Sequence, residues 1–385
     1  MFGSRIKSVL ISSLILVGSN LWSVPSEGNF DFRNQVKARK LFERLTGIPL
    51  SVNDPRLNQM ATLISQGKDL QAATIATNDP AFYNDTVRQW AAPMSNKEGS
   101  AFVPLNDFIA MIIGVTRDQT DARELLTGNF TYYARNITPT PSPDNNTHYE
   151  RSDAAQNDLY TNLVKKTPQD PRIPETAGLL TSRAWGDAHL KAGTNRRGLQ
   201  YSLQVFLCKP IESLMDFTIP DNWVRRDVDR KPGGVFKTYQ TRCVGCHAGM
   251  DSMGGAFARF DFGPNRLVYG AAPFVAPKMN NNKSVFPPGN VVVDDSWENQ
   301  WIRDNQGQLE SPGVKNGIQA LGELLANADS FKACMARTVF TELCRRKPEA
   351  SEEKLIEDLA GKFQASGYKL RSLFEEVAVT AACGG

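Results

Sequence analysis

The chain has 385 residues, enough for roughly two or three domains with cores of their own. Lys and Arg number 44 against 41 Asp and Glu, so the formal net charge is only +3. This near balance argues against a nucleic-acid-binding protein, which normally carries a strongly basic face. Short basic clusters such as Arg225–Arg226 are expected to be solvated surface charges, and no nucleic-acid partner is predicted.

The N-terminus has the pattern of a secretory signal peptide. Arg5 and Lys7 precede an apolar run at 8–18, and small residues follow at possible cleavage sites within 23–26. The run is shorter than the roughly 20 residues that a membrane-spanning helix needs. We therefore expect 1–26 to be a signal peptide, with an uncleaved anchor as the alternative. The mature protein is then predicted to lie in the periplasm or at the outer cell surface, without a stable membrane span.

The N-terminal half predicts helices. Residues 32–49 place apolar side chains on one face and end in a Gly and a Pro, a common C-terminal signal. Asp79 and Pro80 are suited to be the N-cap and the first residue of another helix. Residues 104–115 are apolar nearly all round and predict a buried helix.

A Pro-rich stretch at 138–150 follows, with prolines at 139, 141 and 143, and predicts a linker in which His148 is exposed. Beyond it, 153–166 and 194–208 predict helices. The 260s to 300s are rich in Pro, Gly and Asn and predict a long irregular segment, of the kind that is functional or wraps a bound group.

The C-terminus returns to helical patterns. Residues 331–344, 351–367 and 368–383 each place apolar side chains on one face and are joined by short loops. Such an arrangement predicts a small helical bundle.

The segment TRCVGCHAGMDSMGG, residues 241–255, contains Cys243, Cys246 and His247 in C-x-x-C-H spacing. Thiols at i and i+3 lie about one helical turn apart, so both can reach the vinyl groups on one edge of a haem. The histidine at i+4 lies on the same face and presents its imidazole to the iron. The pattern therefore predicts one covalently attached haem c, with His247 as an iron ligand.

Other functions of Cys243 and Cys246 are less well supported by the sequence. A zinc site would need further ligands in compatible spacing, and no second C-x-x-C exists in the chain. A thioredoxin-like redox pair normally belongs to a βαβ context, which the neighbouring sequence does not offer. A disulfide across so short a loop is uncommon.

The haem segment also resembles that of a family of exported bacterial cytochrome c-like proteins of unknown function, whose pattern is CxxCHxxIDPxGxAxxxFD. Here Met250 takes the Ile position, Asp251 the Asp position and Gly254 the Gly position. Ser252 replaces the usual proline, which makes the turn after the motif less rigid. The resemblance implies a haem c and an envelope location, and it implies no known substrate.

Flanking segments are also similar to segments of the same family. Each is a weak motif by itself, and the resemblance rests mainly on their order along the chain. They are 40–49 and 123–133 before the linker, 177–210 before the haem segment, and 331–380 at the closing helices. The resemblance thus covers most of the mature chain. Cys344 and Cys383 are not part of the family pattern.

The four cysteines outside the motif, Cys208, Cys334, Cys344 and Cys383, invite disulfide pairing in an exported protein. Three pairings are possible, and the sequence does not choose between them. If the closing helices run up-down-up, the helix ends that carry Cys344 and Cys383 can meet. Cys208 and Cys334 would then pair by elimination.

The second axial ligand of the iron is expected outside the motif. Met250 and Met253 follow His247 too closely to reach the opposite face, and are expected to pack against the porphyrin or a neighbouring helix. Met279 lies 32 residues after His247, far enough for a loop to pass round the haem edge. His/Met ligation raises the reduction potential and suits electron transfer. The alternative for Met279 is a loop residue with an apolar contact.

His189 is the alternative sixth ligand, at a position where the resembling family has a histidine. A bis-His site would have a lower potential, whereas an unligated histidine beside arginines would suit peroxide chemistry. Arg197, or its neighbour Arg196, is a candidate to pair with a haem propionate, since a guanidinium matches a carboxylate bidentately. Both arginines could instead be surface charges.

Sequence and resemblance together predict a mainly α protein. Its expected parts are a helical N-terminal domain, a Pro-rich linker, a loop-rich cytochrome c-like haem-binding region and a C-terminal helical region, at 27–137, 138–150, 151–310 and 311–385. The expected function is one-electron transfer in the cell envelope, with a redox partner protein that the sequence does not identify. Alternatives are a haem-dependent peroxidase or oxidase-type enzyme and a surface protein with a structural haem.

Overall fold

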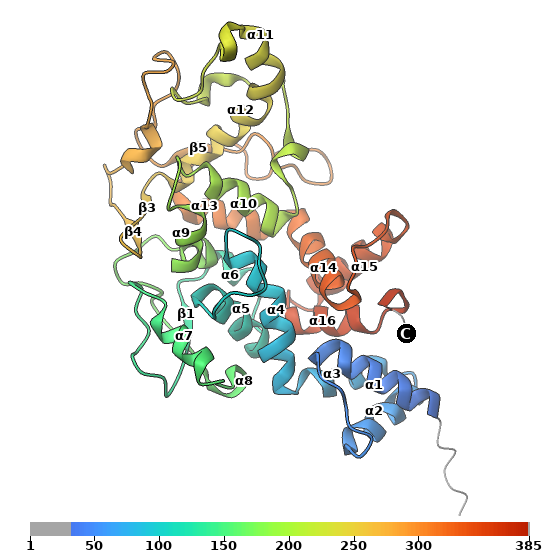
Figure 1. The fold of residues 1–385 in the computed structure, drawn as a ribbon. Coiled ribbons are helices and arrows are strands. Elements are labelled where there is room, and N and C mark those ends of the chain that lie inside the picture. Colours follow the sequence, from blue (N-terminus) through green and yellow to red (C-terminus); the bar gives the residue numbers. More distant parts are fainter. Residues whose placement is uncertain (1–31, 384–385) are drawn as a thin grey trace, which may run out of the picture.

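The computed structural model describes residues 32–383, and the predicted signal peptide at 1–26 lies outside them. The described chain is mainly helical, as predicted, and its strands form only two-stranded antiparallel sheets. Figure 1 shows the helices of the two chain ends side by side in the lower half of the molecule. The segment that carries the C-x-x-C-H motif lies at the opposite end.

The N-terminal part begins with six helices: α1 (Phe32–Thr46), α2 (Pro55–Ser65), α3 (Asp69–Thr77), α4 (Arg88–Ala91), α5 (Asp107–Asp118) and α6 (Glu124–Thr127). Helix α5 is buried on all sides, as its apolar sequence predicted. The Asp79 carboxylate accepts a hydrogen bond from the Ala81 amide at 2.8 Å, as expected of an N-cap. The helical segment that follows includes a π-helical turn, Phe82–Val87.

The next elements are β1 (Thr131–Ala134), α7 (Thr147–Ala154), α8 (Leu159–Asn162) and β2 (Leu163–Lys166). The predicted helix over 153–166 is therefore wrong as one element, because the chain is helical only at 153–154 and 159–162 within it and ends as a strand. There the chain pairs as β2 with β1, Tyr132 opposite Lys165, because a partner strand overrides a weak local helical preference.

His148, predicted to be exposed in the linker, is buried instead. Its Nε2 accepts a hydrogen bond from the Ala134 amide at 3.2 Å, and its Nδ1 lies 2.8 Å from the Pro139 carbonyl oxygen. The imidazole thus joins the Pro-rich stretch to β1, a contact that local composition does not reveal.

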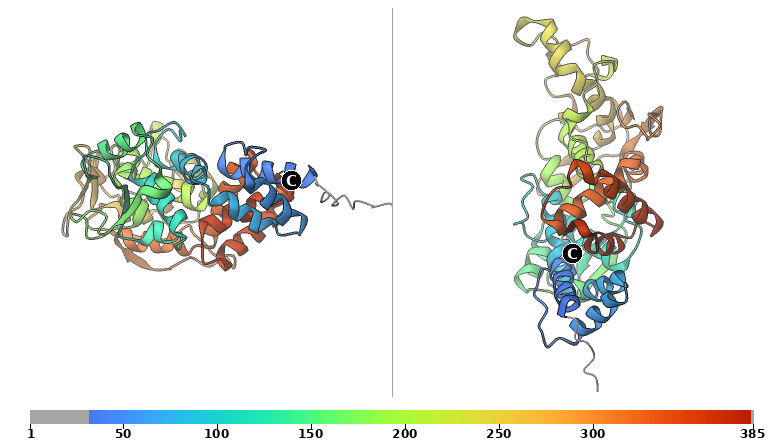
Figure 2. Two further views of the ribbon diagram at one scale, coloured as in Figure 1. Left: turned by 90° about the horizontal axis from the view of Figure 1, so that it is seen from below. Right: turned by 90° about the vertical axis from the view of Figure 1, so that its right-hand side faces the viewer.

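The middle of the chain contains α9 (Arg183–His189), α10 (Arg196–Leu207), α11 (Phe236–Thr238) and α12 (Val244–Met253), then β3 (Phe260–Phe262), β4 (Leu267–Tyr269), β5 (Ser296–Glu298) and β6 (Val314–Asn316). Between β4 and β6 most of the chain is irregular, as predicted for the 260s to 300s. The right-hand view of Figure 2 shows an elongated molecule with α11 and α12 toward one tip.

The C-terminal part contains α13 (Gly317–Asn327), α14 (Asp329–Cys344), α15 (Glu353–Ala365) and α16 (Leu370–Ala378). The last three correspond to the predicted helices, whereas α13 was not predicted. Disulfides join Cys208 to Cys334 and Cys344 to Cys383. The pairing suggested by an up-down-up arrangement is therefore the one in the structure.

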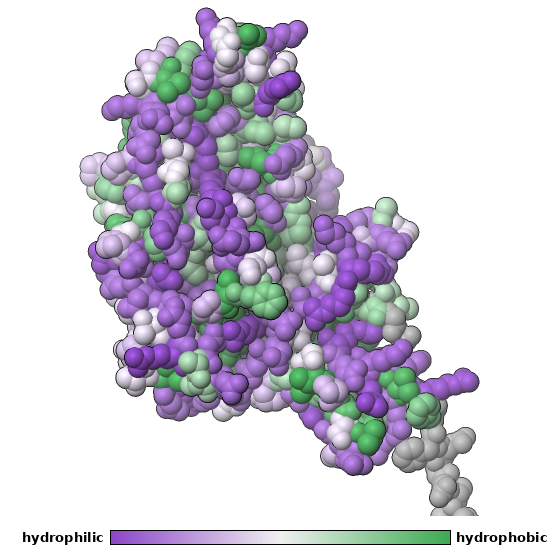
Figure 3. Space-filling model, in the orientation of Figure 1, coloured by the Kyte–Doolittle hydropathy of each residue, from purple (hydrophilic) through white to green (hydrophobic). Residues whose placement is uncertain are grey.

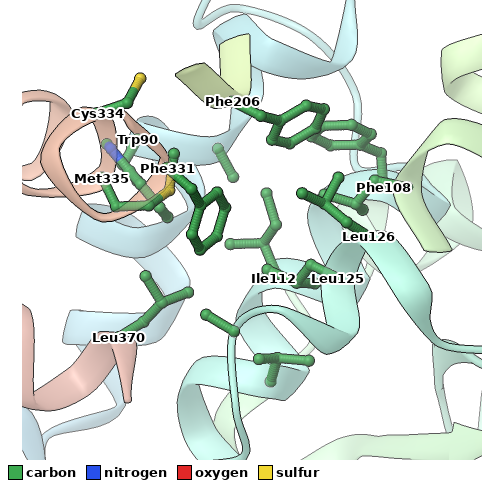
Figure 4. Close-up of a cluster of buried hydrophobic side chains, with 14 of the residues drawn as sticks. Trp90, Phe108, Ile112, Leu125, Leu126, Phe206, Phe331, Cys334, Met335 and Leu370 are labelled. Atoms are coloured by element: carbon green, nitrogen blue, oxygen red, sulfur yellow. The ribbon is translucent and has the colours of Figure 1, made fainter. Parts of the chain in front are cut away.

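The buried apolar side chains form one large cluster that draws on all these parts. Figure 4 shows its centre, where Phe108 and Ile112 of α5, Phe206 of α10 and Phe331 of α14 converge. Because the core is continuous across residues 137, 150 and 310, the predicted domain boundaries do not separate independent cores and stay predictions.

The surface seen in Figure 3 is mostly hydrophilic, with scattered apolar areas that include part of the tip around α11 and α12. Between residues 32 and 383, no helix combines the length and the apolar character needed to cross a membrane.

Candidate functional site

The C-x-x-C-H motif lies on one continuous helical segment at the tip. Cys243 ends a π-helical turn, Tyr239–Cys243, and Cys246 and His247 follow in the first turn of α12. The motif cysteines are free thiols, in contrast to the four disulfide-bonded ones. Both are partly exposed, and burial raises the pKa of the Cys246 thiol above its ordinary value.

The helix is held by close contacts at its glycines. The Trp301 indole packs against Gly249 so closely that any Cβ there would overlap the ring. On another side, Phe217 lies against Gly245, whose carbonyl oxygen accepts a hydrogen bond from the Asp216 amide at 3.0 Å. These contacts fix the position of α12 without using the three motif side chains.

His247 faces a buried carboxylate one helical turn further on. Its Nδ1 lies 3.7 Å from Oδ2 of Asp251, beyond normal hydrogen-bond length, and has no other polar partner. The imidazole side chain is 27 % exposed, whereas the Asp251 side chain is fully buried. The ring is therefore partly open to solvent while its Nδ1 points toward Asp251.

Asp251 belongs to a buried group of alternating charges that we call the Arg196 cluster: Arg196, Arg225, Asp227 and Asp251. Arg196 binds Asp251 with Nε–Oδ1 and Nη2–Oδ2 distances of 2.6 and 2.9 Å. It also binds Asp227, with Nη1–Oδ2 and Nη2–Oδ1 distances of 2.6 and 2.8 Å. The backbone amide of Arg225 donates to Oδ2 of Asp251 at 3.0 Å. Two cations thus balance two anions in the interior.

Electrostatics keep the cluster ionised. Burial alone would raise the pKa of Asp251, but Arg225, His247 and Arg196 outweigh it and hold that pKa well below its ordinary range. Burial lowers the pKa of Arg225 to about 10, so this guanidinium is still charged at neutral pH. The prediction that Arg225–Arg226 is a solvated pair is wrong for Arg225, which is 1 % exposed.

Met279 lies close to the same cluster. Its side chain is fully buried in a small apolar group with Ala258 and Ala276. Its sulfur is 3.9 Å from Nη1 of Arg225, which also donates to the Thr194 carbonyl oxygen at 2.8 Å. A chain of contacts therefore runs from His247 through Asp251 and Arg225 to Met279.

His189 lies at the end of α9 in an aromatic cage, its ring 4.3 Å from that of Trp185 and 4.4 Å from that of Tyr201. Its Nδ1 accepts a hydrogen bond from Nε of Arg197 at 3.3 Å, and its buried Nε2 has no partner. Burial first, and then Arg197, lower the pKa of His189 to about 3. A ligating histidine normally donates from its second nitrogen, the opposite of this arrangement.

The two neighbouring arginines point in different directions. Arg197 contacts His189, stacks over Tyr201 at 4.5 Å and donates to the Lys97 carbonyl oxygen at 3.3 Å. Arg196, in contrast, reaches the helix of the motif through Asp251. Of the two, only Arg196 is thus connected to His247, and Arg197 as a haem-binding residue stays an untested prediction.

Met250 and Met253 are buried in the apolar core, at 7 % and 0 % exposure, in keeping with the packing role expected of them. Arg225 and Asp227 were not among the site residues predicted from the sequence. The sequence offered a faint signal, a run of alternating charges at 225–230, which also fits an exposed loop.

Comparison with known proteins gives one partial match. Residues 315–382 match a family described as a protein of unknown function (DUF1585), a domain found in cytochrome c-like proteins. This stretch contains the closing helices that were compared with the cytochrome c-like family. No curated protein and no solved structure matches the chain.

Two free thiols and an imidazole on successive turns of one helical segment are the donors that a covalently bound haem requires. The unpaired Nδ1 of His247, directed at a carboxylate, is what a ligating histidine needs behind it. Val235 and Phe236, a few residues before Cys243 in the chain, are exposed apolar side chains, at 52 % and 47 %. The residues present therefore fit this group.

Proposed function

We propose that this chain is an exported monohaem c-type cytochrome-like protein that transfers single electrons in the cell envelope. The observation that carries the proposal is that the cysteines fall into two groups, free thiols in the motif and disulfide-bonded cysteines elsewhere. Cys243 and Cys246 stay free beside His247, whereas the other four are paired. The match to a domain found in cytochrome c-like proteins supports it independently.

In this proposal Cys243 and Cys246 would hold the haem through thioether bonds, and His247 would bind the iron through Nε2. The bound haem supplies a one-electron couple. The protein holds the helix that carries the motif in position. Trp301 fixes the helix at Gly249, and the Arg196 cluster anchors its C-terminal half through Asp251.

For the second axial ligand we keep Met279 ahead of His189. Met279 is a buried thioether whose contacts through Arg225 and Asp251 lead to the Nδ1 side of His247, so ligation would require it to reach the Nε2 side when haem is attached. His189 accepts a hydrogen bond from Arg197 on the nitrogen that a ligating histidine would use as a donor. A reduced-minus-oxidised spectrum of Met279→Ala tests this order. A sulfur-to-iron charge-transfer band in the unaltered protein that is lost in Met279→Ala supports Met279. A low-spin spectrum without that band, which becomes high-spin in His189→Ala, would reverse the order.

The decisive experiment is expression of the full chain in a bacterium with the c-type haem maturation machinery. We expect a haem stain that survives denaturing electrophoresis, and no stained band from Cys243→Ser plus Cys246→Ser. As the matched control, Cys344→Ser plus Cys383→Ser removes a disulfide and should keep the stain. A wild-type protein without covalent haem would refute the proposal.

The same preparation tests location and the enzymatic alternative. Export predicts recovery from the periplasm or the cell surface, with a mature N-terminus after Ser23 or Ser26. Two protein ligands predict a low-spin oxidised spectrum, as suits transfer to and from a redox partner protein. A high-spin spectrum with rapid reaction toward peroxide would instead support a haem-dependent peroxidase or oxidase-type enzyme.

A further inference from the structure

We infer that Asp251 is a positioning residue for His247, accepting the Nδ1 proton of the iron-bound imidazole and lowering the reduction potential of the haem. This inference rests on the proposed function, since it concerns the residue behind the proposed iron ligand. The resemblance assigned Asp251 only a place in a sequence pattern. The structure shows that the Asp251 carboxylate faces Nδ1 of His247 and is held by Arg196 and by the Arg225 amide.

The geometry of α12 places the Asp251 carboxylate behind the His247 ring. His247 and Asp251 are four residues apart on α12, so their side chains lie on one face of the helix. Nδ1 and Oδ2 are 3.7 Å apart, and a side-chain adjustment of less than about 1 Å would bring them to hydrogen-bond distance. Nδ1 has no other partner. With Nε2 on the iron, Nδ1 carries the proton and needs an acceptor.

The Asp251 carboxylate also has an acceptor position left. An ionised carboxylate has roughly four such positions, two on each oxygen. Oδ2 accepts from Nη2 of Arg196 and from the Arg225 amide, and Oδ1 accepts from Nε of Arg196. The position left for the imidazole is therefore on Oδ1, so the adjustment that joins the two groups must turn the ring or the carboxylate toward that oxygen. The remaining donors hold both oxygens in place, so the carboxylate is fixed before a haem is attached.

The negative charge of the Asp251 carboxylate also supports the inference. The Asp251 side chain is fully buried, and it is the anion of the Arg196 cluster that faces His247. Asp227 pairs with the other side of Arg196. An anionic acceptor behind a ligating histidine makes the imidazole a stronger donor to the metal. This favours the ferric over the ferrous state, because the ferric state has one more positive charge to stabilise.

The test measures the reduction potential of the haem-loaded full chain by spectroelectrochemistry. Asp251→Asn keeps the side-chain size and removes the charge. We expect the one-electron equilibrium to shift at least tenfold toward the ferrous state, a rise of ~59 mV. Asp251→Glu restores a carboxylate and should recover most of the shift.

Asp227→Asn is the matched control, because it removes the same charge from the same arginine without touching His247. We expect less than a third of the Asp251→Asn shift. Equal shifts in the two variants would overturn the inference, since they would reflect the charge of the cluster rather than the contact with the imidazole. No shift in Asp251→Asn would overturn it as well.

A measurement on the unaltered protein covers the case in which Asp251→Asn does not fold. In the ferrous state, proton NMR should show the Nδ1 proton of His247 in slow exchange with water, as expected for a buried hydrogen bond. Rapid exchange would contradict the inference. These results presuppose attached haem, so absence of haem refutes the proposed function, whereas attached haem with a rapidly exchanging Nδ1 proton refutes only the role of Asp251.

Discussion

The centre of the molecule and its tip bury their residues by different means. Around α5 and α14, Phe108, Ile112 and Phe331 pack in an apolar cluster. Around α12, the Arg196 cluster buries two arginines and two aspartates. The apolar centre gains free energy from removing carbon from water. The charged tip gains little net stability, since desolvation offsets attraction, but it fixes side chains in defined positions. Rigid placement is what the proposed redox site would need.

The largest expected effect comes from the centre. Phe331 is 2 % exposed, and Phe331→Ala should lower the free energy of unfolding by ~4 kcal/mol through lost burial and the cavity left behind. Urea unfolding followed by circular dichroism measures it. The same substitution at Phe102, which is 98 % exposed, should cost less than ~0.5 kcal/mol. If Phe331→Ala also changed the reduction potential of the proposed haem, the apolar centre and the charged tip would not act separately.

At the tip, Arg225→Met should cost ~3 kcal/mol, because it leaves Asp251 with one cation fewer in the interior. Unlike the substitution at the centre, it should also shift the haem potential, since it changes the charge near His247. The neighbouring Arg226 is partly exposed and donates to the Gly289 carbonyl oxygen. Arg226→Met should therefore cost only ~1 kcal/mol. Equal losses in the two variants would show that the buried charge has no special role.

The effect that is smallest at neutral pH concerns the protonation of His189, because it appears only on acidification. The folded protein keeps His189 neutral down to a pKa of about 3, whereas in the unfolded chain it takes up a proton near 6.5. The stability that this residue contributes is complete above pH 6.5 and falls as the pH drops toward 3, by up to ~1.4 kcal/mol per pH unit. Urea unfolding at a series of pH values should show a shallower acid loss for His189→Gln than for the unaltered chain. Parallel curves would mean that His189 is not buried as a neutral group.

The same contrast explains which helices and site residues could be predicted from the sequence. Apolar periodicity and end signals predict α1, α5, α10 and the closing helices, because one face of each must be buried. The motif cysteines and His247 follow from spacing alone. Arg225 and Asp227 could not be predicted, since their burial depends on Arg196 of α10 and Asp251 of α12, which only the fold brings to them. His148 and β2 were missed for the same reason: long-range contacts override local preference.

The disulfide between Cys208 and Cys334 has a consequence for the order of assembly. Its two cysteines are 126 residues apart, and both thiols of the motif lie between them. In a chain that crosses a membrane N-terminus first, Cys208 meets Cys243 and Cys246 in the oxidising compartment before its own partner arrives. If the chain is exported and takes up haem as proposed, the Cys243 and Cys246 sulfurs can then either oxidise to a disulfide or form thioether bonds. Replacing Cys208 with serine would remove that competition, and the yield of haem-loaded protein would report its cost.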